Sequence, residues 1–172
     1  MRSAKAWHIA ILSAVAVTMV ASATLVRADP SPTPEEIEFA TEAADLLQAE
    51  LFAALLQEFD ETTPGNVEEG KQSISLVFAD SHSNFRLVGI FDPLRANDRP
   101  QDSFERRALD SALNGGQPLT EVQRDNGSWV YRRSIPLSAF RSECALCHTN
   151  FAGLGASDWV GALMLRVPIT QN

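Results

Sequence analysis

The sequence predicts an α+β fold, in which antiparallel strands form one sheet and the N-terminal helices pack on one of its faces. Apolar residues recur at helical spacing over residues 33–59, near the start of the chain. Segments with strand patterns gather in the second half, where Asn126-Gly127 is typical of a two-residue hairpin turn. Helices followed by strands, without regular alternation, indicate this fold class.

The first helix has the clearest signals. Thr33 suits the N-cap position, Pro34 the first helical position, and Glu36 completes a capping box. The apolar residues at helical spacing are Ile37, Ala40, Ala44, Leu47, Leu51, Leu55 and Phe59. This stripe indicates a core face or the seam of a homodimer.

A second helix is predicted from Asn66, with Glu69 as its capping partner, towards Asp80. The segment also alternates like a strand near "SISLVF", so this assignment has a rival. If it is helical, Ile74, Phe78 and His82 lie on one face, because residues four apart are neighbours on a helix.

The remaining elements follow in order. They are a strand at 85–91, an extended loop at 92–100, a short helix at 103–113 ended by Asn114-Gly115-Gly116, a hairpin of 119–125 with 128–137, and a last strand at 158–170. The two thiols of one Cys-x-x-Cys motif lie between the hairpin and the last strand.

The N-terminus reads as a secretory signal peptide at residues 1–28. Arg2 and Lys5 precede an uncharged apolar run, and small residues end it. Residues 29–34 form a proline-containing linker, and residues 35–172 form one domain. We therefore expect an exported, periplasmic protein; the alternative is a membrane anchor formed by an uncleaved segment 6–26.

Charge limits the partners of the mature chain. The formal net charge is −8, and it becomes about −11 after cleavage, because residues 1–28 carry three bases and no acid. So acidic a chain is not attracted to nucleic acid or to anionic lipid.

The strongest motif is Cys144-x-x-Cys147-His148, which contains the only two cysteines of the chain. One helical turn would present both thiols to the two vinyl groups of a haem, and the histidine would bind the iron. The expected cofactor is therefore one covalent haem c, with His148 as an iron ligand.

Three other interpretations of the motif were weighed. A redox dithiol is possible chemically, but it usually follows an early strand of a βαβ unit. A structural zinc ion needs four ligands, and few remain. A disulfide closing so short a loop adds little stability.

The far side of the iron has two candidate ligands, His82 and Met164; the third possibility is an open position. Met164 stands among apolar strand residues and suits the core. For the haem propionates the candidate cations are Arg95, Arg99 and Arg166, together with Arg132 and Arg133. The last two should point to opposite faces of their strand.

The chain resembles a bacterial family in "FRLVGIFDPLRANDRPQDSFERRAL", "YRRSIPL", "CALCH" and "DWVGALMLRVPI". It is similar to the periplasmic single-haem c-type domains with a PAS-like fold, over most of residues 33–170. The resemblance implies a PAS-like sheet and one haem attached at Cys144 and Cys147, with His148 as ligand. It also implies redox or small-ligand sensing.

One departure concerns the iron. The family typically carries another cysteine, a candidate second axial ligand, before the Arg-Asn-Pro loop, whereas here Phe78 stands near that place. His82 could replace it, or the position could be open.

The expected function is redox or diatomic-gas sensing through covalent haem, with the signal passing to a separate redox or signalling protein. The alternative is an electron-transfer cytochrome. Peroxidase-like chemistry and a haem-free dithiol protein rank lower. An iron with two strong protein ligands suits electron transfer, whereas a displaceable position suits sensing.

Overall fold

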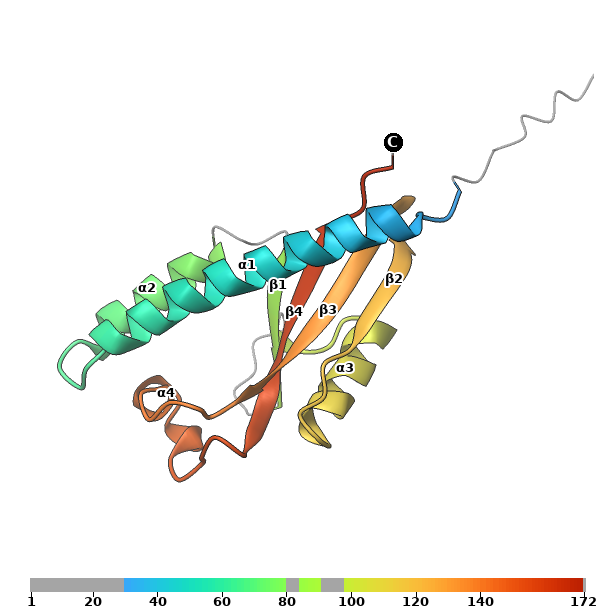
Figure 1. The fold of residues 1–172 in the computed structure, drawn as a ribbon. Helices are drawn as coiled ribbons and strands as arrows, with labels where there is room; N and C mark the ends of the chain where they lie inside the picture. Colours follow the sequence, from blue (N-terminus) through green and yellow to red (C-terminus); the bar gives the residue numbers. More distant parts are fainter. Residues whose placement is uncertain (1–29, 80–83, 91–97, 172) are drawn as a thin grey trace, which may run out of the picture. The chain divides into compact units, whose positions relative to one another are not determined.

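The computed structural model describes residues 30–79, 84–90 and 98–171 (Figure 1). The compact unit Ser31–Asn172 contains all the described elements. Its helices are α1 (Pro34–Glu61), α2 (Val67–Ala79), α3 (Ser103–Leu113) and the single turn α4 (Cys144–Cys147); its strands are β1 (Phe85–Gly89), β2 (Thr120–Asp125), β3 (Ser128–Ser138) and β4 (Trp159–Pro168). The predicted α+β class is confirmed.

The start of α1 follows the sequence prediction. Thr33 Oγ1 accepts a hydrogen bond from Glu36 N at 3.2 Å, and Thr33 N donates to Glu36 Oε2 at 2.8 Å. These two bonds form the predicted capping box, with Pro34 in the first turn. The helix buries Ala40, Ala44, Leu51 and Leu55, which are four members of the predicted stripe.

Asn66 precedes α2 as predicted, but its side chain serves the preceding turn. Its Oδ1 accepts from Thr63 N at 2.6 Å, and its Nδ2 donates to Glu61 O at 2.9 Å. The tight connection between α1 and α2 leaves backbone groups that need these partners. The helical assignment of residues 67–79 is confirmed over the rival strand.

All four strands form one antiparallel sheet in the order β1-β4-β3-β2. The hairpin of β2 and β3 turns at Asn126 and Gly127, whose φ angles are 50° and 88°. Positive φ at both positions is what a type I′ turn requires, and Asn-Gly supplies it at little cost. The register between β3 and β4 shifts between Leu137, which pairs with Gly161, and Ser138, which pairs with Trp159.

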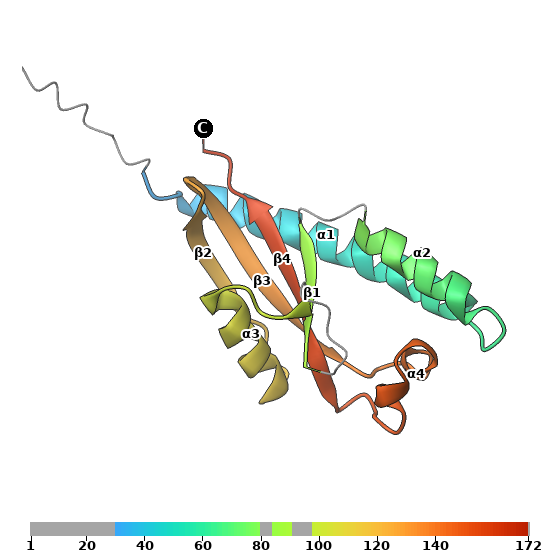
Figure 2. The same cartoon turned by 180° about the vertical axis from the view of Figure 1, so that it is seen from behind.

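Helices cover both faces of the sheet (Figures 1 and 2). The side that packs on α1, here called the α1 face, carries Phe85, Tyr131, Leu163, Leu165 and Val167. The opposite side, here called the α3 face, carries Val88, Ala162 and Met164 against Phe104 and Ala108 of α3. The predicted packing by α1 is confirmed, and the sequence did not show that α3 would cover the second face.

Helix α3, which packs on the α3 face, is short and is capped at both ends. Asp102 accepts from Glu105 N at 2.9 Å at the start of the helix, and the Asn114 N–H donates to Asp110 O at its end.

Within the described ranges, we find no helix whose length and apolarity would suffice for a membrane span.

Candidate functional site

Both cysteines of the motif project from the single turn α4. Leu146 N donates to Glu143 O at 3.0 Å, and His148 N donates to Cys144 O at 2.8 Å. Residues three apart on a helical turn lie on the same side, so this turn brings the two thiols together and ends at the histidine. The structure therefore groups Cys144, Cys147 and His148, as the sequence analysis expected.

The two thiols are free and half-buried. Burial raises the pKa of Cys144, and it also raises the pKa of Cys147. A redox dithiol needs the opposite shift, because the thiolate is the nucleophile. The environment of these thiols is therefore poorly suited to disulfide exchange.

A metal-binding cluster is also missing from this region. Over the described residues, no three His, Cys, Asp or Glu side chains converge so as to hold a metal ion. A structural zinc ion normally requires four such ligands. The zinc interpretation therefore finds no support in the part of the chain that can be described.

His148 is exposed, and one side of its ring stacks on Phe151, with ring centroids 4.8 Å apart and an interplanar angle of 19°. Partial desolvation, together with the positive charge of Lys71, lowers the pKa of His148, while Asp98 opposes the shift. The imidazole is therefore neutral at pH 7, which is the form that binds metals. Phe151 N donates to His148 O at 2.8 Å and fixes the adjoining turn.

Two side chains just before the motif attach it to the end of α1. Arg141 forms an ion pair with Asp60 and a second one with Glu143, where Nε and Oε2 are 3.3 Å apart. Phe140 packs edge-on against Phe59, with ring centroids 6.2 Å apart. The cysteine turn is thereby held beside helices that are distant in sequence.

Sequence reasoning missed two cations near the motif, Lys71 and Arg141. Lys71 of α2 is close enough for its charge to act on both Cys147 and His148. It pairs with Glu68 at 2.7 Å, and both side chains are exposed. The available signals were that Lys71 is the only lysine after residue 5 and that Arg141 lies three residues before Cys144.

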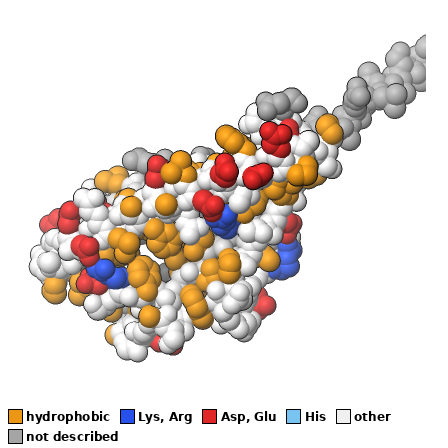
Figure 3. Space-filling model, in the orientation of Figure 1, with side chains coloured by type: hydrophobic (Ala, Val, Ile, Leu, Met, Phe, Trp, Pro, Cys, Tyr) orange, Lys and Arg blue, Asp and Glu red, His pale blue; other side chains and the backbone are white. Residues whose placement is uncertain are grey.

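Apolar side chains are exposed around the motif. Leu87 lies two residues beyond the buried Phe85 on the α1 face, yet it is 36% exposed, and Phe140 is 38% exposed. Leu76 of α2 and Ile90 after β1 are also exposed. Figure 3 shows hydrophobic side chains gathered between the paired helices α1 and α2 and the α4 turn. Such a surface beside reactive groups is typical of a ligand site.

A cavity of about 190 Å³ lies between α1, α2 and the start of β1. Leu47, Leu51, Val77 and Phe85 line it, together with Glu50. Val77 and Phe85 flank the connection between α2 and β1, which carries His82. His82 itself, like Arg95, lies outside the described residues.

The other candidate residues are away from the motif. Met164 is buried on the α3 face at 3% exposure, so it packs in the core. Arg166 lies on the same face and pairs with Asp125 at 2.8 Å. It is about 23 Å along β4 from Trp159, the strand residue nearest the motif, at ~3.3 Å per residue. Its role as a propionate partner stays a prediction.

The remaining arginines also have partners elsewhere. Arg99 is exposed, and its carbonyl oxygen accepts a hydrogen bond from Arg86. Arg132 and Arg133 point to opposite faces, as the strand pattern predicted: Arg132 pairs with Asp102 of the α3 side, and Arg133 with Asp45 of α1. Neither arginine belongs to the α4 region.

No protein-family model matches the chain, and no curated protein sequence matches it significantly.

Proposed function

We propose that this chain is an exported protein that holds one haem c, through thioether bonds at Cys144 and Cys147 and through His148 as iron ligand. Its function on this proposal is to sense redox state or a diatomic gas. The observation that carries the proposal is the α4 turn, on which two free thiols and a neutral imidazole lie within five consecutive residues.

On this proposal, apolar side chains of the described residues would cover the porphyrin. Exposed Leu87, Ile90 and Phe140 offer apolar surface to cover a macrocycle, and burying it would be favourable by about 25 cal/mol per Å². Lys71 and Arg141 are cations of the described residues beside the turn that would pair with the propionates; each now pairs with carboxylates, Lys71 with Glu68 and Arg141 with Asp60 and Glu143. When bound, haem supplies a one-electron couple and a coordination position for a small ligand.

The candidates for the second axial ligand are Met164 and His82. Met164 is packed on the other face of the sheet, so it is not available to the iron. His82 remains the one candidate from the usual ligand set, and it follows α2 on the chain. If His82 is displaceable or absent from the iron, a diatomic gas has an open position. The four-stranded antiparallel sheet between helices is compatible with a PAS-like sensor fold.

An electron-transfer cytochrome is the second candidate function. It depends on His82, which follows α2 in the sequence and lies outside the described residues. Firm ligation by His82 would give an iron with two imidazoles, which changes little on reduction. The raised pKa of both thiols disfavours the haem-free dithiol alternative.

The experiment is the absorption spectrum of the purified, reduced protein with and without CO. Gas sensing predicts that CO shifts the spectrum at micromolar concentration. A low-spin spectrum that CO leaves unchanged would overturn gas sensing and support redox sensing or electron transfer. A protein without haem, made together with haem-attachment machinery, would overturn both.

A further inference from the structure

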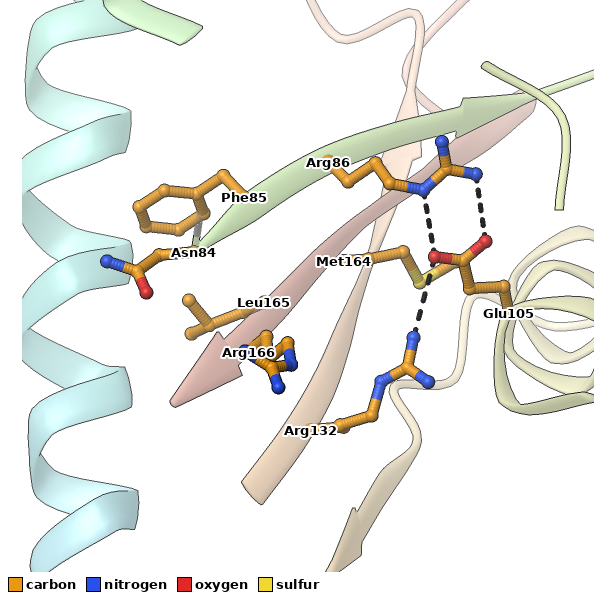
Figure 4. Close-up of a pocket in the computed structure, with 8 residues that line it drawn as sticks. All are labelled: Asn84, Phe85, Arg86, Glu105, Arg132, Met164, Leu165 and Arg166. Carbon is orange, nitrogen blue, oxygen red and sulfur yellow. Dashed lines mark hydrogen bonds and ion pairs between the residues drawn. The ribbon is translucent and has the colours of Figure 1, made fainter. Parts of the chain in front are cut away.

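A second polar site lies on the α3 face of the sheet. A cavity of about 90 Å³ opens there between β1, β4, β3 and α3. Three arginines from three strands line it, Arg86, Arg132 and Arg166, with Glu105 of α3 as the acidic residue of the lining (Figure 4). Met164 contributes an apolar wall. This site is distinct from the cysteine turn, which adjoins α2 and the end of α1.

Glu105 holds two of these guanidinium groups. Its carboxylate accepts from Arg86 Nε and from Arg86 Nη2, both at 2.8 Å, and it lies 3.4 Å from Arg132 Nη2. Figure 4 shows the two arginines converging on this carboxylate from either side. One negative charge is thus shared between two positive charges in the wall of the cavity.

Two more carboxylates form ion pairs with arginines of this cluster. Asp102 pairs with Arg132, and Asp125 pairs with Arg166 at 2.8 Å. Both acids are partly exposed, and neither lines the cavity. The positive charge that faces the cavity therefore exceeds the negative charge of its lining.

Arg132 provides an unused donor at this site. Its side chain is 8% exposed, and its Nε is buried and has no hydrogen-bond partner. The guanidinium carbon lies 4.4 Å from the centroid of the Phe104 ring, which fixes the plane of the group. A buried N–H without an acceptor is uncommon in a native structure and costs free energy, so a bound acceptor would stabilise it.

We propose that this cavity binds a small carboxylate, of the size of formate or acetate. A water molecule needs roughly 10–15 Å³ in such a cavity, so a volume of about 90 Å³ holds an anion of three to four heavy atoms with some water. A guanidinium N–H group donates a charge-assisted hydrogen bond to a carboxylate oxygen. The buried Arg132 Nε supplies one such donor. Arg166 already binds Asp125 through Nε at 3.0 Å and Nη2 at 2.8 Å, so it supplies positive charge and its remaining N–H groups.

The test is thermal unfolding of the purified protein with sodium acetate or sodium formate, against sodium chloride at equal ionic strength. We expect Tm to rise with the logarithm of the acetate or formate concentration above the dissociation constant, by about 9 °C at a hundred times that constant. An equal response to chloride or phosphate, or no rise with any of these anions, would overturn the proposal.

Two variants remove the same charge at different places. Arg166→Gln should weaken acetate binding about tenfold, because Arg166 lines the cavity but is exposed enough for the fold to tolerate the change. Arg107→Gln is the matched control. Arg107 of α3 forms an exposed ion pair with Glu121 of β2 and does not line the cavity. Equal affinity losses in both variants would show a bulk charge effect and overturn the proposal. The presence or absence of haem does not enter this test.

Discussion

The two faces of the sheet are held to their helices by different forces. On the α1 face a long helix buries an apolar stripe against Phe85, Leu163 and Leu165, and polar contacts lie at the edges. On the α3 face a short helix combines a small apolar cluster with the buried Glu105, which pairs with two arginines. Apolar side chains on the α1 face can be partly exposed beside the cysteine turn without destabilising the fold strongly. On the α3 face, removing one partner of a buried ion pair leaves an uncompensated charge and is strongly destabilising.

The largest effect is expected at the cysteine turn. Cys144→Ser or Cys147→Ser each removes one thiol that would bond to a vinyl group. We expect covalent haem to fall severalfold in either variant and to be lost in the double variant, measured by haem staining after denaturing electrophoresis. Ser142→Ala, two residues before Cys144, is the control and should retain haem. Full covalent haem in the double variant would contradict the account.

The next effect concerns the ion pairs of the α3 face. Glu105→Gln keeps the shape of the side chain but leaves Arg86 and Arg132 without their shared carboxylate. Removing one partner of a buried pair costs about 3–5 kcal/mol in the free energy of unfolding. Urea unfolding of the apoprotein measures it. Glu121→Gln, which breaks the exposed pair with Arg107, should cost less than about 1 kcal/mol.

Variants of the two candidate iron ligands, His82 and Met164, test the proposed haem against the two faces of the sheet. His82→Ala should convert a low-spin iron to a high-spin, CO-reactive one if His82 is bound. Met164→Leu, on the α3 face, should leave the spectrum unchanged, because its sulfur is packed against α3. A spectral change in the Met164 variant would contradict the placement of the haem beside α4, and an unchanged His82 spectrum would remove His82 from the iron.

The thiols should titrate above the usual range. Burial raises the pKa of both Cys144 and Cys147, so at pH 7–8 each binds its proton more firmly than a free cysteine does. Iodoacetamide labelling of the haem-free protein should therefore rise with pH around a midpoint above about 8.5. A midpoint below that of a model peptide would restore the dithiol interpretation.

The smallest effects compare the two helix caps. Thr33→Ala should cost about 1 kcal/mol in the free energy of unfolding, because the Thr33 cap is exposed. Asp102→Ala should cost more, since Asp102 both caps α3 and pairs with Arg132. Equal losses in urea unfolding would contradict the difference between the two faces.

The ion pair and cap of Asp102 should also make the stability of the fold depend on pH. Desolvation by itself would raise the pKa of Asp102, but hydrogen bonds from Glu105 N and from Arg132 lower this pKa overall. A lowered carboxyl pKa stabilises the fold above the unfolded value of about 3.9, and that stability is lost as pH falls through the folded pKa. The wild type should therefore lose stability below about pH 4 more steeply than Asp102→Ala does.

Features set by neighbouring residues could be predicted from the sequence. The capping box at Thr33, the turn at Asn126-Gly127, the bounds of α3 and the opposite directions of Arg132 and Arg133 all follow from local spacing. The grouping of Cys144, Cys147 and His148 on one turn is local in the same sense, whereas haem binding by this turn stays a prediction.

Features that depend on tertiary packing could not be predicted. Strand alternation separates the two faces, but it does not say which helix covers each, so α3 on the second face was missed. The ion pair of Arg166 with Asp125 joins residues 41 positions apart, so the sequence did not reveal it. Lys71 and Arg141 reach the cysteine turn only because α2 and the end of α1 pack beside it.

The central claim is that Cys144 and Cys147 hold a haem covalently. The most direct measurement is the pyridine haemochrome spectrum of protein made together with haem-attachment machinery, recorded after extraction with acidified organic solvent. The account predicts a c-type spectrum that remains with the polypeptide, at one haem per chain. A colourless polypeptide, or haem that leaves with the solvent, would contradict it.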